Sequence, residues 1–178
     1  MLIKKLHEWF NIIGLFLLSV LLCSTFYVQI AFHHLPCPLC LLQRLGFAGV
    51  GIAIICNLAI EIKARHYGLM LLSALFGFGS ALRHMFLHIT PNDPGFGPPI
   101  FGLHLYVWSA MIFGLILVLG ALALVFESGF HKVKNTFITK TVMWLFLLLI
   151  AANALSSLLE CGVGQCPANP ETYLLLNW

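Results

Sequence analysis

The residues of this chain best suited to chemistry are two cysteines in the run Leu35–Arg44, which reads LPCPLCLLQR. Cys37 and Cys40 have the Cys-x-x-Cys spacing that redox-active disulfides share with half zinc sites. Pro36 and Pro38 disfavour a helix that continues back through Cys37, so we expect Cys40 in the first turn of the following helix. There the positive end of the helix dipole would stabilise a thiolate, which is the nucleophilic form. The pair is therefore predicted to carry out thiol–disulfide exchange.

Arg44 follows Cys40 by four residues and so shares its face of the predicted helix. By helical rise it lies roughly 6 Å below the start of that helix, where a charge within a membrane is costly and usually functional. Its permanent positive charge would favour the Cys40 thiolate and stabilise negative charge on an acceptor such as a quinone carbonyl. The alternative is a side chain that extends to the lipid headgroups. With Cys40 above it, we favour the functional role.

A second pair, Cys161 and Cys166, follows the last apolar segment. Two glycines between these cysteines permit a tight, exposed loop, and two prolines shortly after it limit further helix. We predict that a thiolate of another protein attacks this pair, with Cys166 the favoured sulfur, while a structural disulfide and half a metal site are the alternatives. Cys23 and Cys56 instead fall inside apolar segments, where a thiol behaves as a small hydrophobic group.

The elements that must position these residues are membrane helices. About 61% of the chain is hydrophobic and 8% charged, against roughly 25% charged in an average soluble domain. Five apolar runs each approach the roughly 20 residues that a helix needs to cross the hydrocarbon. We expect an all-α integral membrane bundle, a single domain over residues 1–178, with spans at about 10–32, 41–60, 68–89, 105–126 and 141–159 and a tail at 160–178.

The basic residues predict how these spans are oriented, because short loops rich in Lys and Arg stay cytoplasmic. Those next to the spans all fall in segments that belong on one side: Lys4, Lys5, Lys63, Arg65, Lys132, Lys134 and Lys140. The opposite side receives residues 33–40, 90–104 and 160–178, none of which contains a Lys or Arg. Both cysteine pairs are thereby placed on the outer side, where disulfides persist. Topology accounts for the net charge of +3, and a nucleic-acid role has no support.

Two motifs resemble a known family. Cys37-Pro-Leu-Cys40 followed by Leu-Leu-Gln-Arg44 is similar to the signature of the DsbB family of bacterial disulfide-bond formation proteins, and Ser80-Ala-Leu-Arg83 is similar to another stretch of it. The resemblance covers about residues 9–126 and implies a four-helix core, here with a fifth transmembrane helix added. It also implies a multi-pass protein of the bacterial inner membrane with a cytoplasmic N-terminus and a periplasmic C-terminus.

The resemblance further implies a thiol:quinone oxidoreductase that oxidises a periplasmic thioredoxin-like (DsbA-like) dithiol protein and reduces ubiquinone or menaquinone. Cys37 and Cys40 would be the quinone-facing pair, with Cys40 in contact with the quinone and Arg44 assisting. Typical members carry their second pair between the third and fourth spans, yet residues 90–104 contain no cysteine. Cys161 and Cys166 would then accept the partner's electrons instead.

Further candidates lie at the outer ends of the spans. Quinone reduction consumes protons, so we include Arg83 and His88 among the quinone-binding candidates, with His84 as an alternative to His88. The turn-rich segment 91–99 is expected to cover the redox site. Three alternatives stay open: a relay that runs in the reductive direction, a scaffold held by structural disulfides, and a haem-carrying electron-transfer protein. The haem would be held by histidines among His33, His34, His84, His88 and His104.

Overall fold

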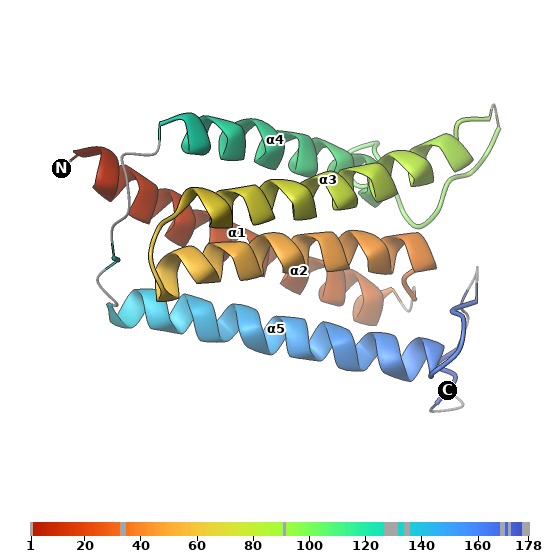
Figure 1. The fold of residues 1–178 in the computed structure, drawn as a ribbon. Helices are drawn as coiled ribbons and strands as arrows, with labels where there is room; N and C mark the ends of the chain where they lie inside the picture. The colour runs from red at the N-terminus through yellow and green to blue at the C-terminus, as the bar shows by residue number, and fades with distance from the viewer. Residues whose placement is uncertain are drawn as a thin grey trace.

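A computed structural model describes residues 2–32, 35–90, 92–126, 132–133, 136–167, 170 and 172–175. Its helices run antiparallel to their neighbours in sequence (Figure 1): α1 Leu2–Ala31, α2 Pro38–Ala59, α3 Ala64–Leu87, α4 Leu105–Val125 and α5 Phe137–Cys161. All five are long and apolar enough to cross a membrane, and the described residues form no strand beyond one isolated bridge. The expected all-α membrane bundle is thus confirmed, and the chain is a multi-pass membrane protein.

Several helices begin earlier than the apolar runs predict, most clearly α1 at Leu2 and α5 at Phe137. An apolar run marks only the part of a helix that lies in hydrocarbon, whereas the backbone hydrogen bonds continue into the polar boundary. The start of α5 is fixed by Thr136, whose hydroxyl oxygen accepts a hydrogen bond from the Thr139 N–H at 3.3 Å. Pro38 occupies the first position of α2, where its missing N–H costs nothing.

The helices pack most closely where α2 meets α3. A Cβ atom added to Gly46 of α2 would lie 2.7 Å from the Cα atom of Gly77 of α3, so the two backbones are in direct contact. Phe113 of α4 covers Gly77 and stacks on Phe47 of α2, with ring centroids 4.0 Å apart. The other side of the bundle is formed by α1 and α5, which pack against each other and against α2. Helix α2 therefore touches all four of the other helices and lies at the centre of the bundle.

A buried polar cluster ties three helices together at one end of the bundle. The Asn57 amide of α2 donates to the Asn11 Oδ1 of α1 at 3.0 Å, and the Asn11 amide donates to the Tyr67 hydroxyl of α3 at 2.9 Å. The same hydroxyl lies 2.8 Å from the Nδ1 of His7, and the ring of His66 is bonded to the Asn57 Oδ1 at 3.1 Å. These contacts satisfy the polar groups that burial would otherwise leave unpaired.

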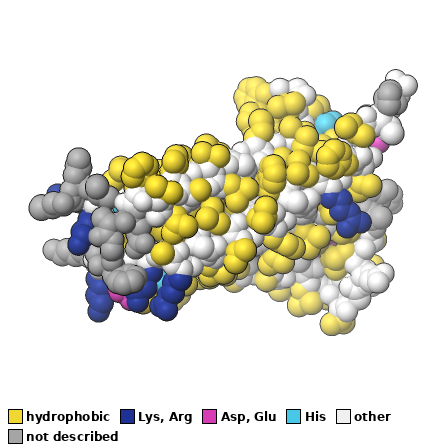
Figure 2. Space-filling view, turned by 45° about the horizontal axis from the view of Figure 1, so that its top comes forward, with side chains coloured by type: hydrophobic (Ala, Val, Ile, Leu, Met, Phe, Trp, Pro, Cys, Tyr) yellow, Lys and Arg dark blue, Asp and Glu magenta, His cyan; other side chains and the backbone are white. Residues whose placement is uncertain are grey.

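The two ends of the bundle differ in charge. Most of the Lys and Arg side chains visible in Figure 2 gather at one end, with a smaller dark blue patch near the opposite end, and hydrophobic side chains cover the length between the ends. We name this the basic end; it holds Lys4, Lys5, Lys63, Arg65 and Lys132, whereas Lys134 lies outside the described residues. The opposite end, named the cysteine end, holds residues 35–40, 92–104 and 160–167. The loops are thus grouped as the charge pattern predicts, and which end faces the cytoplasm stays a prediction.

Candidate functional site

The first cysteine pair is built by the start of α2. Cys37 is the residue before the helix, with φ −65° and ψ 162°, and its sulfur accepts a hydrogen bond from the Cys40 N–H at 3.2 Å. Cys40 lies in the first turn, as the proline positions predict. The two sulfurs are 2.8 Å apart and not bonded, Cys37 being buried and Cys40 half-buried. The structure therefore shows a dithiol whose two sulfurs are close enough to form a disulfide bond.

Electrostatics at this pair favour negative charge on Cys37. The hydrogen bond from the Cys40 thiol lowers the pKa of Cys37 well below the usual value of a thiol; burial opposes this shift, and His84 adds to it. The ring nitrogens of His84 lie 3.9 and 4.0 Å from the Cys37 sulfur. From the sequence we expected the helix N-terminus to stabilise the thiolate of Cys40. In the structure the N–H group at the helix start points to Cys37, because Cys37 occupies the capping position.

Arg44 lies between α2, α1 and α5. Its guanidinium donates to the Gln29 Oε1 at 2.9 Å and to the Thr25 carbonyl at 3.4 Å, both on α1, and to the Asn153 Oδ1 of α5 at 3.4 Å. It also lies 5.6 Å from the centroid of the Phe26 ring. These contacts direct the guanidinium into the bundle and away from the lipid headgroups, so the permanent positive charge stays one helical turn from Cys40.

A small cavity of about 80 Å³ opens beside the first pair. Its walls include the polar side chains of Cys40, Gln43, Arg44, His84 and Tyr106. The Gln43 amide is 3.3 Å from the Nδ1 of His84, which links α2 to α3 at this wall. Residues 96–98 of the loop between α3 and α4 also line the cavity, so the expected cover over the redox pair is present.

Two predicted quinone-binding residues lie outside the lining of this cavity. Arg83 is exposed, and no hydrogen bond or ion pair of its guanidinium occurs among the described residues. His88 is bonded through Nδ1 to Asp93 at 2.9 Å; its ring lies against Tyr106. A hydrogen bond from the Gly95 N–H, and to a smaller extent the one with His88, holds the pKa of Asp93 below its usual range. Their role as quinone ligands stays a prediction, whereas His84 both lines the cavity and approaches Cys37.

The second pair lies where α5 ends. A disulfide joins Cys161, the last residue of the helix, to Cys166. Gly162 takes a positive φ of 62°, which turns the chain out of the helix at this point. Cys161 is buried and Cys166 half-buried, and the loop between them is exposed at Val163. Cys166 is thus the more accessible sulfur of the disulfide.

The tail after this disulfide returns to the bundle. The Leu174 N–H donates to the Glu160 carbonyl at 3.4 Å, and the Leu175 N–H donates to the Leu159 carbonyl at 3.1 Å. The Gln29 amide donates to the Tyr173 hydroxyl at 2.9 Å, while its Oε1 accepts from Arg44. A continuous set of hydrogen bonds therefore connects Arg44, below the first pair, to the tail that follows the second.

Glu160 and Gln29 are site residues that sequence reasoning missed. Glu160 is fully buried next to Cys161, and neither carboxylate oxygen has a hydrogen-bond partner within the part of the chain that the structure describes. Its signal in the sequence was an acidic residue at the end of an apolar run. Nothing in the sequence marked Gln29 as a site residue. His33 and His34, named for the haem alternative, lie outside the described residues.

Comparisons with known proteins agree with this site. The family model "Disulfide bond formation protein DsbB" matches residues 7–96, which include Cys37, Cys40, Arg44 and His84 and end before the second pair. A Burkholderia thailandensis protein named "Disulfide bond formation protein B" is 30% identical over 156 residues, covering 66% of this chain and 89% of its own length.

Proteins of the same name give shorter matches. The one from Xanthomonas axonopodis pv. citri is 33% identical over 97 residues, or 48% of this chain and 56% of its own. The one from Pseudomonas syringae pv. tomato is 34% identical over 96 residues, or 51% of this chain and 55% of its own length. No solved structure matches. From the family-model match and the coverage of its Burkholderia relative, this chain belongs to the DsbB family of membrane proteins that form disulfide bonds.

Proposed function

We propose that this chain is a protein-disulfide:quinone oxidoreductase of the bacterial inner membrane, with the cysteine end in the periplasm and the N-terminus in the cytoplasm. It reoxidises a periplasmic thioredoxin-like (DsbA-like) dithiol protein and passes two electrons to ubiquinone or menaquinone. The observation that carries the proposal is the close pair of Cys37 and Cys40 beside a cavity into which Arg44 brings a permanent positive charge. The family membership supports the disulfide-forming part of this activity.

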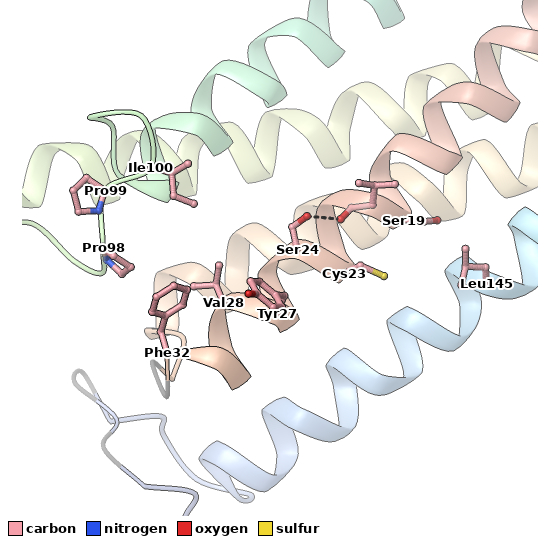
Figure 3. Close-up of a pocket in the computed structure, with 11 residues that line it drawn as sticks. Ser19, Cys23, Ser24, Tyr27, Val28, Phe32, Pro98, Pro99, Ile100 and Leu145 are labelled. Carbon is pink, nitrogen blue, oxygen red and sulfur yellow. Dashed lines mark hydrogen bonds between the residues drawn. The ribbon is translucent and has the colours of Figure 1, made fainter.

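The surroundings of the cavity fit a lipid-soluble quinone. A groove of about 700 Å³ runs along the side of α1 and shares two wall residues, Val28 and Pro98, with the small cavity (Figure 3). Most of the groove is apolar, and the Ser24 hydroxyl on its wall donates to the Val20 carbonyl of its own helix at 2.8 Å. An isoprenoid tail would follow this groove, and the polar ring would lie at the cavity, where Arg44, Gln43 and His84 would hold the carbonyl oxygens.

The thiol chemistry follows from the two pairs. A thiolate of the reduced partner attacks the Cys161–Cys166 disulfide, with Cys166 the more accessible sulfur, and the partner leaves oxidised. The dithiol so formed then reduces the disulfide form of Cys37 and Cys40. A bound quinone supplies the final acceptor for two electrons and two protons. Arg44 stabilises the negative charge that develops near Cys40.

The test is quinone reduction by the purified chain, with a reduced thioredoxin-like protein as donor. We expect Cys37→Ser and Cys40→Ser each to abolish the decrease in quinone absorbance, because each removes one sulfur of the pair that passes electrons on. Cys56→Ala is the matched control, since Cys56 lies near the other end of α2. Undiminished reduction in both serine variants would refute the proposal. A Soret band in the purified protein would support the haem carrier instead.

A further inference from the structure

Glu160 is the buried ionisable group that the proposed mechanism leaves unused. Its side chain is 0% exposed, and both carboxylate oxygens are without a hydrogen-bond partner among the described residues. A buried carboxyl group without partners is costly, and an apolar side chain of similar size would stabilise the bundle better. Stability therefore gives no reason for an acid at this position.

The position of Glu160 joins the two redox pairs. It directly precedes Cys161 in α5, and its backbone is fixed by the hydrogen bond from the Leu174 N–H. The ionisable groups that act on its carboxyl group are Arg44 of α2 and Cys37, while α1 contributes the neutral Gln29 and the tail contributes Tyr173 near Arg44. The end of α5 and the start of α2 lie at the same end of the bundle (Figure 1). The carboxyl group of Glu160 is thus held away from solvent at the end of the bundle where both pairs lie.

Building on the proposed function, we propose that Glu160 is the base that accepts a proton when the Cys161 and Cys166 dithiol reduces the disulfide of Cys37 and Cys40. Thiol–disulfide exchange requires a thiolate as the attacking group, so the attacking thiol must first lose its proton. Both pairs have a buried cysteine, Cys161 and Cys37, which water reaches poorly. A carboxylate beside Cys161 provides the base that water would otherwise supply.

The step balances within the chain. The Glu160 carboxylate takes the proton of the Cys161 thiol, and the Cys161 thiolate attacks the Cys40 sulfur, which releases Cys37 as a thiolate. The proton of the Cys166 thiol then passes to the Cys40 sulfur as the Cys166 thiolate attacks the Cys161 sulfur, which restores the Cys161–Cys166 bond and releases Cys40 as a thiol. Two electrons and one proton now reside on the first pair, and the second proton resides on Glu160. The two sulfurs lie 2.8 Å apart in the structure, close enough for the Cys40 thiol of this product to donate a hydrogen bond to the Cys37 thiolate.

The exchange step is tested in a single turnover without quinone. Reduced thioredoxin-like protein is mixed with the oxidised chain, and acid quenching followed by alkylation and mass spectrometry measures labelled Cys37 and Cys40 over time. We expect Glu160→Gln to slow this labelling at neutral pH by about 10²-fold, the lower range for loss of an acid–base group. The residual rate should rise about tenfold per pH unit, because hydroxide must then remove the proton. Glu160→Asp, which keeps a carboxyl group, should restore part of the rate.

A second measurement reports the proton itself. Infrared difference spectra between the two redox states should show a carboxyl C=O band that is lost in Glu160→Gln and shifted in Glu160→Asp. An unchanged exchange rate and pH profile in Glu160→Gln would overturn the inference. If the glutamine variant fails to fold, a band that is absent from the wild-type chain or unshifted in Glu160→Asp would overturn it equally.

Quinone reduction driven by dithiothreitol separates this inference from the proposed function. This small dithiol can reduce the first pair directly, so the wild-type rate of quinone reduction with it reports on the first pair without the exchange step. A wild-type chain that reduces quinone with neither donor would refute the proposed function. A chain that is active with both donors, and whose exchange step is indifferent to Glu160, would refute only the role of Glu160.

Discussion

Cys37 combines two roles that are usually carried by different residues. Its sulfur accepts the Cys40 N–H as a helix cap does, and it is also one half of the redox pair. Hydrogen bonds to the charged form of a group favour that form, so each contact that caps the helix also favours the thiolate. The start of α2 and the reactivity of its first cysteine are therefore coupled.

The contribution of His84 to Cys37 can be measured by alkylation. The lowered pKa of Cys37 means that its thiolate predominates above that pKa and is lost as the pH falls through it. We expect the alkylation rate of Cys37 in the reduced chain to stay level through neutral pH and to decrease only in acid. In His84→Phe the decrease should move to higher pH, because one group that favours the thiolate is gone. Phe86→Ala, on the exposed side of α3, should keep the wild-type profile; identical profiles for all three chains would contradict the assignment.

Sequence reasoning identified the residues of the first pair and Arg44 because they lie within one short motif whose spacing defines their geometry. It could not identify Gln29 or select His84 over His88. These choices depend on which faces of α1, α2 and α3 meet, and residues distant in sequence carry no local sign of that contact. Glu160 was visible as an acid in an apolar setting, yet its closeness to Arg44 arises only from packing.

At the scale of the elements, the contact between α2 and α3 depends on glycine. An added methyl group at Gly46 would meet the Gly77 backbone, which cannot rotate away as a side chain can. We expect Gly46→Ala to separate the helices and to lower the free energy of unfolding by about 1–3 kcal/mol, as overpacking does. Gly79→Ala is the control, because nothing lies within 4 Å of its added methyl group. Unfolding in detergent micelles measures both, and equal stabilities would contradict the close approach.

The positions of the spans could be predicted from the sequence, whereas the packing of the helices against one another could not. Length and hydropathy locate an apolar helix in a membrane without any knowledge of its neighbours. In α4, however, Phe113 is fully buried and Leu115 is 56% exposed, although both are apolar. Lipid and protein interior accept the same side chains, so hydropathy does not distinguish the lipid-facing side of a helix from its packed side. The arrangement of α1 and α5 around Arg44 was therefore beyond reach of the sequence pattern.

At the scale of the whole molecule, the separation of basic and cysteine ends predicts the orientation in the membrane. In a chain with Phe101→Cys, an exposed position at the cysteine end, a membrane-impermeant thiol reagent should label intact bacterial cells after removal of the outer membrane. Lys132→Cys, exposed at the basic end, should be labelled only after the inner membrane is opened. The parent chain measures background from its own cysteines. The reverse labelling pattern would place the cysteine end in the cytoplasm and would refute the proposed exchange with a periplasmic protein.

The single membrane domain over residues 1–178 stays a prediction. The family model matches the part of the chain that carries the first pair, and the second pair lies beyond that match, after α5. The tail that follows the second pair is connected to Arg44 through the hydrogen bonds of Gln29. A sequence comparison restricted to residues 7–96 would describe the first pair and miss the second.

The position of Cys161 at the end of α5 also sets an order of assembly during synthesis. The ribosome delivers Cys37, Cys40 and Arg44 to the membrane long before Cys161 and Cys166 emerge. A nascent chain arrested before the last helix is inserted would hold an electron-passing pair with no entry point for a donor protein. In the proposed relay, only the complete chain could therefore accept electrons from the donor, and fragments that lack residues 161–166 would be inactive toward it.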